Sequence, residues 1–166
     1  MLKVRAEILS KDAFAPFGTF HSLDCRGCEV LGEPPIEFFR DLHIQSVAGS
    51  NIAWSLCRVS KRPPVIDTAE FHSCSSEALV ALDGDMYFFV GPATPKGSPF
   101  PALRVKVFRV PQFTTIIIRP GVWHHAPFVV ASERLNVLVT LPERTYANDC
   151  FVSKLNDDER IEVITS

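Results

Sequence analysis

Glycine is scarce in this sequence, and long apolar runs are absent from it. The 166 residues include 8 glycines, against 13 prolines and 13 phenylalanines. No uninterrupted apolar stretch approaches the roughly 20 residues of a membrane-spanning helix. Proline removes a backbone donor and interrupts helices, so 13 prolines in a chain of this length exclude long helices. The composition therefore favours an all-β protein.

The sequence also lacks an excess of charge of either sign. Lys and Arg number 17 and Asp and Glu number 19, which gives a formal net charge of −2 at pH 7. This balance excludes the basic footprint of a nucleic-acid-binding protein. The apolar fraction of 46% and the charged fraction of 22% exclude disorder and collagen-like repeats. We expect one domain over residues 1–166, with no nucleic-acid or membrane partner.

The sequence has five cysteines, an odd number that cannot all pair in disulfides within the chain. In residues 1–7, every second position from Lys3 onward carries a charge. A secreted disulfide scaffold and a signal-peptide core both fit poorly, so we expect a reducing, cytoplasmic location. Cys25 and Cys28 have the spacing of a metal knuckle or a redox pair. Because no second pair follows, we expect two thiols in a polar loop. Cys57 and Cys74 lie among apolar or small residues, which predicts small core positions.

Near the N-terminus, Ser10 is a predicted helix cap for one or two turns over residues 11–18, which end at a Pro/Gly stop. Residues 21–35 are polar and are predicted to form a loop. Residues 37–42 fit a short helix or a strand equally well, because their periodicity does not distinguish the two.

Short strands bounded by turn residues are predicted for most of the rest of the chain. Asp83-Gly84-Asp85 is a hairpin signal between two of them, and Phe88, Phe89 and Phe113 are expected to fill the interior. Turn signals every 8–12 residues are typical of a sandwich or barrel, so we predict one β domain with short helices at its ends. The predicted strands cover residues 51–59, 79–82, 86–90, 103–107, 113–118 and 135–141.

Two places concentrate groups that coordinate metals or transfer protons. In a strand over residues 70–72, Glu70 and His72 point to the same face, and Glu77 can turn back toward them from the next strand. His124 and His125 follow a turn and are expected to face opposite sides, so that one imidazole faces into a barrel. Two histidines with carboxylates suit Mn, Fe, Ni or Zn. Each cluster alone is typical of a surface pair, but together they indicate a shared site.

The spacing of Glu70, His72, Glu77 and Gly84 resembles the first cupin motif, and residues 121–124 resemble the end of the second. The resemblance implies a cupin double-stranded β-helix, a jelly-roll barrel. It also implies four metal-ligand positions, namely Glu70, His72, Glu77 and His124, with Glu70 standing where the family usually has a histidine. The usual glycine at the start of the second motif is missing, since Phe113 occupies that register.

A narrower resemblance covers the chain nearly end to end. Residues 13–18 after a Leu-Ser pair, the Glu70-x-His72 element, residues 122–125 and residues 148–150 are similar, in order, to signatures of the ureidoglycolate lyase family. Membership implies a small cytoplasmic homodimer that splits the small molecule ureidoglycolate into glyoxylate and urea in purine breakdown. It also implies a divalent metal such as Ni, Mn or Zn.

The implied reaction removes the substrate's hydroxyl proton while urea departs. Glu77 or His125 is the expected general base, provided that it is not occupied by metal. Arg119 or Arg58 is expected to pair with the substrate carboxylate, although a solvated charge at a strand end is an equally good interpretation of either arginine.

The sequence also departs from this family. Residues 117–120 are Ile-Ile-Arg-Pro where the better-known lyases have an Asn-Tyr-His-Arg-like stretch, and Glu77 stands where those lyases have Gln. Two alternatives therefore stay open. One is a cupin isomerase or epimerase acting on a small hydroxy or sugar acid, and the other is a non-catalytic cupin that binds a metabolite.

Overall fold

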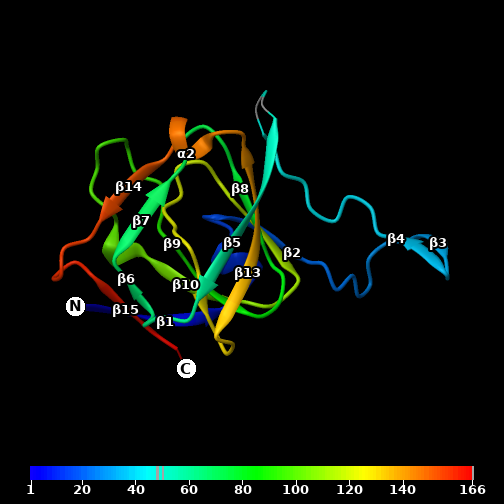
Figure 1. Ribbon diagram of the computed structural model, residues 1–166, viewed down its shortest axis with the longest axis horizontal. Helices are drawn as coiled ribbons and strands as arrows, with labels where there is room; N and C mark the ends of the chain where they lie inside the picture. The colour runs from blue at the N-terminus through cyan, green and yellow to red at the C-terminus, as the bar shows by residue number, and fades with distance from the viewer. Residues whose placement is uncertain (48, 50, 166) are drawn as a thin grey trace.

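Two curved sheets face each other in the body of the protein (Figure 1), and the buried apolar residues form two clusters. The computed structural model describes residues 1–47, 49 and 51–165. The six-stranded sheet has the order β12 (Phe128–Val129), β9 (Met86–Val90), β10 (Lys106–Val110), β1 (Leu2–Ile8), β15 (Ile161–Ile164) and β6 (Val65–Ile66). The five-stranded sheet has the order β2 (Gly18–Ser22), β11 (Thr114–Ile118), β8 (Glu77–Ala81), β13 (Arg134–Pro142) and β5 (Ile52–Ser60). The mostly β fold predicted from the sequence is confirmed.

Two strand pairs and three short helices complete the described structure. The pairs are β7 (Thr68–Phe71) with β14 (Phe151–Lys154) and β3 (Leu31–Glu33) with β4 (Ile36–Phe38). The helices are α1 (Lys11–Phe14), the 3₁₀ helix η1 (Ala102–Arg104) and α2 (Thr145–Asn148). No helix in the described part of the chain is long and apolar enough to cross a membrane.

The predicted helix cap at Ser10 is confirmed, and α1 carries the first core residue. Ser10 Oγ accepts a hydrogen bond from the Ala13 amide, and Phe14 one residue later is fully buried. Its ring meets Phe108 of β10 edge-on, with 5.4 Å between ring centroids. Burying one such ring contributes about 1.5–3 kcal/mol. Helix α1 is thus fixed to the six-stranded sheet by contact between aromatic rings.

The interior phenylalanines were only partly predicted. Phe88 and Phe89 of β9 are buried, as expected. Phe113 is not: its φ of 55° turns the side chain outward at the start of β11, and 51% of it is exposed. Cys74 is likewise exposed rather than in the core.

The predicted hairpin at residues 83–85 is wrong, because its two strands belong to different sheets. β8 lies in the five-stranded sheet and β9 in the six-stranded sheet. The turn's carboxylates bond neighbouring segments on either side: Asp83 accepts from the Asn136 amide at 2.7 Å, and Asp85 accepts from the Gln112 amide at 2.9 Å. The same turn residues that signal a hairpin therefore make a crossing between sheets.

Other strands also have bounds that differ from the predicted ones. The predicted strand 103–107 begins with η1, and the strand itself starts at Lys106. Residues 2–8 and 161–164, for which no strands were predicted, form β1 and β15, which pair in parallel.

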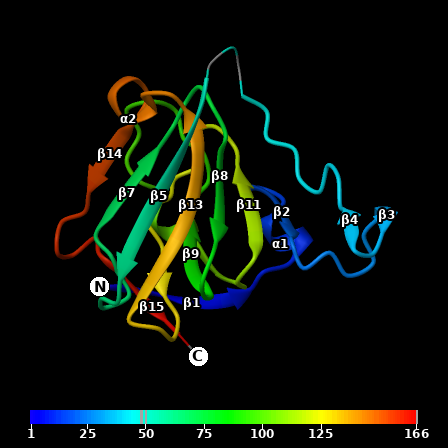
Figure 2. The ribbon, with the colours of Figure 1, turned by 45° about the vertical axis from the view of Figure 1, so that its right-hand side comes forward.

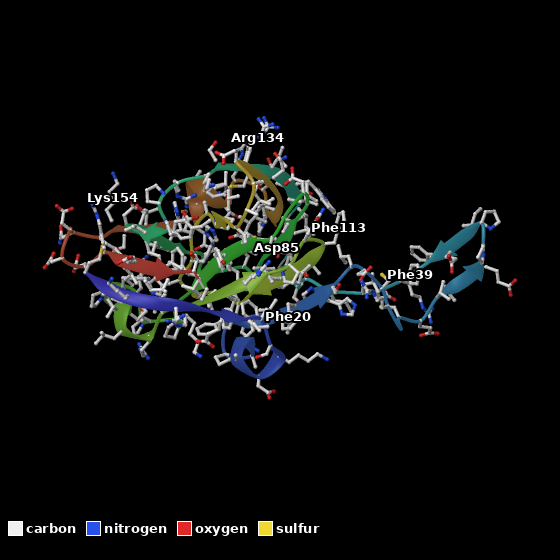
Figure 3. All side chains as sticks on the ribbon, turned by 90° about the horizontal axis from the view of Figure 1, so that it is seen from below. Phe20, Phe39, Asp85, Phe113, Arg134 and Lys154 are labelled. Carbon is white, nitrogen blue, oxygen red and sulfur yellow. The ribbon has the colours of Figure 1, made fainter. Side chains whose placement is uncertain are left out.

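Residues 23–44, which we call the arm, leave the sheets and extend away from the body (Figures 1 and 2). The predicted loop ends in the small β3–β4 hairpin. For residues 37–42, where a helix and a strand were both possible, the structure has a strand that ends at Phe38. Figure 3 shows Phe39 on the link between this hairpin and the body. The hairpin exposes much of its apolar surface, including 77% of Ile36 and 62% of Phe38.

The edge strand β5 carries a second exposed apolar surface. The alternation predicted over residues 51–59 is present, but Ile52, Trp54 and Leu56 lie on the outer face of the sheet and are 47–72% exposed. Cys57 faces inward instead and packs against the core.

Candidate metal and active site

The two predicted clusters meet inside the barrel because their strands pair there. Glu70 at the end of β7 and His124 form an isolated antiparallel bridge, with amide-to-carbonyl distances of 2.7 and 2.8 Å in the two directions. His72 follows two residues after Glu70 and points to the same side, as the strand period requires. Glu77 opens β8 and reaches the same point from the facing sheet.

The side chains converge closely. One ligand atom from each of Glu70, His72 and His124 lies within 4.8 Å of the others. Glu77 Oε2 lies 2.8 Å from His124 Nε2 and 3.3 Å from His72 Nε2. His72, Glu77 and His124 are all at least 95% buried. We call these four residues the barrel site.

Hydrogen bonds to backbone carbonyls orient both imidazoles. His72 Nδ1 donates to the Asp149 carbonyl at 2.6 Å, and His124 Nδ1 donates to the Val122 carbonyl at 2.9 Å. A carbonyl oxygen can only accept, so each ring carries its proton on Nδ1 and turns Nε2 toward the centre. His72 Nε2 is buried, and Glu77 Oε2 lies 3.3 Å from it. Histidines that bind a metal through one ring nitrogen are commonly oriented by such a hydrogen bond from the other.

Asp149 fixes the segment that carries His72. Its carboxylate accepts hydrogen bonds from the Ser73 amide at 2.9 Å, the Ser73 hydroxyl at 2.6 Å and the Cys74 amide at 2.7 Å. Burial raises the pKa of Asp149, but the bonds from Ser73 and Cys74 outweigh it and leave the pKa below its usual value. The carboxylate therefore remains ionised and clamps the turn after β7.

The charges inside the barrel are mutually dependent. Burial raises the pKa of Glu77, but His124 and then His72 outweigh it and lower the pKa to about 2. For His72, burial lowers the pKa, whereas the hydrogen bonds with Glu77 and Asp149 raise it, with a net increase. A buried carboxylate is thus kept ionised by two imidazoles, as expected for a buried charge that has partners.

A small cavity of about 50 Å³ adjoins these groups. This is room for an ion and a few water-sized groups. Its lining includes both His124 and His125, so both adjacent histidines border the site and not only one. Burial is the chief cause that lowers the pKa of His125. Tyr146 of α2 also borders it, and its ring meets His72 edge-on at 5.9 Å. Burial and then Glu77 raise the pKa of Tyr146, which keeps its hydroxyl protonated.

The structure brings Glu70, His72, Glu77, His124 and His125 together, but it places both predicted arginines elsewhere. Each arginine side chain is exposed and makes another bond.

Arg58 Nε donates to Asn136 Oδ1 at 2.9 Å on the outer face of the sheet. Arg119 donates to the Ala15 carbonyl and lines a different cavity beside Gly18 and Thr19.

Four residues near the site were not among the predicted site residues. Cys150 Sγ donates to Glu70 Oε2 at 3.3 Å, and burial and then Glu70 raise the pKa of Cys150 to about 12. Asp149 and Cys150 belong to the Asn-Asp-Cys element that resembles a family signature, so a signal for them was present. Tyr146 and Cys57 had no such signal, because α2 and the inward face of β5 bring them in only through the fold.

The donor set fits a divalent cation. Two Nε2 atoms are aimed inward, and Glu70 adds a carboxylate oxygen, which makes these three residues a candidate metal-binding triad. Imidazole and carboxylate ligands together suit Mn, Fe, Ni and Zn. His124 Nε2 lies 2.8 Å from Glu77 Oε2, so a cation bound at this atom would displace the contact between them.

Comparisons with known proteins agree with this arrangement. Residues 1–162 match the protein-family model described as ureidoglycolate lyase. Among solved structures, a dTDP sugar isomerase from Desulfovibrio desulfuricans G20 is 14% identical, with a TM-score of 0.52 over 87% of this chain and 89% of that one. That likeness confirms the predicted cupin fold. No curated protein matches the sequence.

Two further structures are more distant. A dTDP-6-deoxy-D-glucose-3,5-epimerase from Legionella pneumophila Philadelphia 1 is 13% identical, with a TM-score of 0.48 over 80% of this chain and 72% of that one. Oxalate decarboxylase from Bacillus subtilis, described with Mn(II) centres, is 17% identical, with a TM-score of 0.44 over 64% of this chain. The chain covers about a quarter (24%) of that protein's length.

Proposed function

This chain belongs to the ureidoglycolate lyase family, and from that premise we propose that its barrel site cleaves ureidoglycolate into glyoxylate and urea. The observation that carries the proposal is the family match over residues 1–162, together with the convergence of buried His and Glu side chains beside a small cavity. The cavity's size favours a small hydroxy acid over a nucleotide sugar, the substrate class of the structurally similar isomerase.

We propose that Glu70, His72 and His124 hold a divalent metal, with Glu77 as a fourth ligand. Ni, Mn and Zn all suit these donors. The ion would lower the pKa of the substrate's hydroxyl and stabilise its anion. This role is supported by the two Nε2 atoms that turn inward and by the Glu77 carboxylate that lies close to both of them.

The protein's own groups would move the protons. The substrate hydroxyl loses its proton, the C–O bond becomes the carbonyl of glyoxylate, the C–N bond breaks, and the urea nitrogen gains a proton. His125 suits the base, because burial keeps its imidazole neutral at neutral pH, and Glu77 is the alternative base if the metal leaves it free. The protonated Tyr146 hydroxyl borders the same cavity and can donate a hydrogen bond to the departing urea. The role of Arg119 stays a prediction, since its side chain lies at another cavity.

Glyoxylate release from ureidoglycolate, with Ni, Mn or Zn supplied, tests this function. We expect release well above the spontaneous rate with at least one metal. Glu77→Gln keeps the size of the side chain and introduces the residue of the better-known lyases, whereas His125→Ala removes the proposed base. Activity that survives in E77Q but not in H125A would assign the base to His125. No release above the spontaneous rate with any of the three metals would overturn the proposed substrate and favour the isomerase or metabolite-binding alternative.

We also propose that the protein is a homodimer. Two apolar surfaces of the same chain, the β3–β4 hairpin and the outer face of β5, are uncovered in the described structure. A two-stranded hairpin is marginally stable alone in water, so it needs a surface to lie against. A second copy offers both surfaces reciprocally, as a two-fold interface requires.

The mass in solution tests this. We expect a dimer at micromolar concentration that Ile36→Lys or Trp54→Lys dissociates. Leu103→Lys is the matched control, because Leu103 is equally exposed but lies on η1. A monomeric wild-type protein would contradict the proposal.

A cytoplasmic location is proposed as well, supported by five cysteines that all carry free thiols.

A further inference from the structure

The Cys25–Cys28 pair does not stand alone, because the fold brings His21 beside Cys28 and the ring of His43 beside that of His21. The pair is held in a turn in which the Cys28 amide bonds the Cys25 carbonyl at 3.1 Å. Gly27 has a φ of +77° in this turn, a conformation that glycine adopts freely.

The first histidine is His21, at the end of β2. Its Nε2 atom lies 3.8 Å from Cys28 Sγ. Two ligands of one tetrahedral zinc ion lie about 3.5 Å apart when the Zn–N and Zn–S bonds are about 2.0 and 2.3 Å. The pair therefore already has nearly the separation that a shared zinc ion imposes.

The second histidine comes from the other end of the arm. The ring of His43 lies 6.5 Å from the ring of His21, centroid to centroid. Its Nε2 atom bonds the Thr19 hydroxyl at 2.7 Å, whereas its Nδ1 atom is buried and has no hydrogen-bond partner in the described structure. Metal-binding histidines commonly donate a hydrogen bond through one ring nitrogen and bind the ion through the other, which is the division that Thr19 would impose on His43.

From this juxtaposition we propose that His21, Cys25, Cys28 and His43 form a structural zinc site at the base of the arm. We call these four residues the arm cluster. Two thiolates and two imidazoles are a standard ligand set for structural zinc, and thiolates select zinc over the harder Mn²⁺. His43 would bind through Nδ1, with its Nε2 proton donated to Thr19.

A zinc ion at this site would stabilise the arm, which has no apolar core of its own. The arm leaves the body at β2 and returns near His43, and its hairpin buries little apolar surface. Small elements without a core are commonly held by a metal. A zinc ion joining residues 21 and 43 would close the arm at its base, and it would fix the direction in which the hairpin projects. This proposal does not depend on the function of the barrel site.

Cobalt substitution separates the two sites in the full-length protein. After reduction and chelation, the protein is loaded with Co²⁺ and its near-ultraviolet spectrum is recorded. We expect a thiolate-to-cobalt charge-transfer band, which a site of histidines and carboxylates cannot give. The band is expected to disappear in Cys28→Ser and in Cys25→Ser, and to weaken in His43→Ala with at least a roughly 10-fold loss of affinity.

Matched controls locate the band. His124→Ala should lose cobalt at the barrel site and keep the band. Cys57→Ser, which alters a thiol beside the barrel cavity, should keep it as well. Zinc content measured on the same proteins should fall by one equivalent in C28S, while glyoxylate release per folded molecule stays unchanged.

Three results would overturn the proposal. They are a reduced wild-type protein without a thiolate band, a band that survives C28S, and a Cys25–Cys28 disulfide in the fresh protein combined with no zinc uptake after reduction. The last result would assign the pair to redox chemistry instead.

Discussion

The barrel site and the arm cluster both contain histidines, but the fold holds the proposed metal ligands in position more firmly in the barrel site than in the arm cluster. In the barrel, His72 directly follows β7 and His124 forms a β-bridge with Glu70 of that strand, and a backbone carbonyl holds each ring in place. In the arm cluster, only His21 lies on a strand of the sheets, and Cys25 Sγ still donates to the Leu23 carbonyl at 3.1 Å. The fold itself prepares the first site, whereas the second needs an ion to draw its ligands together.

The largest expected difference between body and arm concerns stability. Phe108 is fully buried between the sheets and contacts two other phenylalanine rings, whereas Phe38 of the hairpin is 62% exposed. Phe108→Ala should lower the free energy of unfolding by about 3–5 kcal/mol. Phe38→Ala should change it by about 0.5 kcal/mol or less in the monomer. Urea unfolding at low protein concentration measures both, and equal losses would show that the arm is part of the core.

Next in size is the loss of a barrel ligand. His124→Ala removes an Nε2 donor and leaves the Glu77 carboxylate buried with one partner fewer. Glyoxylate release should fall by about 100- to 1000-fold, which corresponds to about 3–4 kcal/mol. Metal analysis should show one equivalent less. The matched change in the arm cluster, His21→Ala, should leave the rate unchanged, and a comparable loss of activity there would contradict the separation of the two sites.

A smaller effect is expected from the clamp behind His72. Asp149→Ala removes the carboxylate that holds Ser73 and Cys74, but it keeps the backbone carbonyl that bonds His72. Loss of such a supporting partner commonly costs about 10- to 100-fold in metal affinity or activity. Titration with metal and assay of the same protein check this. If D149A binds metal at the barrel site as tightly as the wild type does, the Asp149 carboxylate does not help to position His72 for the metal.

The comparison also explains what the sequence could predict. Glu70, His72 and His124 were predictable because strand alternation fixes the face of a side chain, and because the two motifs sit next to apolar strands. The hairpin at residues 83–85 was not, since the same Asp-Gly-Asp turn serves a hairpin or a crossing between sheets, and contacts such as Asp83 with Asn136 decide between them. The interpretation of residues 1–166 as a single domain stays a prediction.

Contacts far apart in the sequence account for the rest. Asp149 reaches Ser73 across 76 residues, and Thr19 fixes His43 across 24 residues. No local pattern encodes either contact. For the same reason Cys25 and Cys28 suggested a polar loop: the two histidines that complete a ligand set lie on either side of them in sequence, and only the returning arm brings His43 close.

The smallest expected effect concerns acid stability at the crossing between the sheets. The Asn136 amide and side chain bond Asp83 and hold the pKa of its carboxyl below the usual value. A lowered pKa in the folded state stabilises the protein above the unfolded pKa of about 3.9, and this contribution disappears as the pH falls through the folded value. The Tm of Asp83→Asn should therefore lie below that of the wild type at neutral pH and approach it as the pH falls well below the unfolded pKa. Asp24→Asn is the control from the arm, because its carboxylate pairs with the exposed Arg26 side chain, a kind of contact that contributes little. A pH-independent gap for D83N would show that the crossing is held by the shape of the turn rather than by the charge of Asp83.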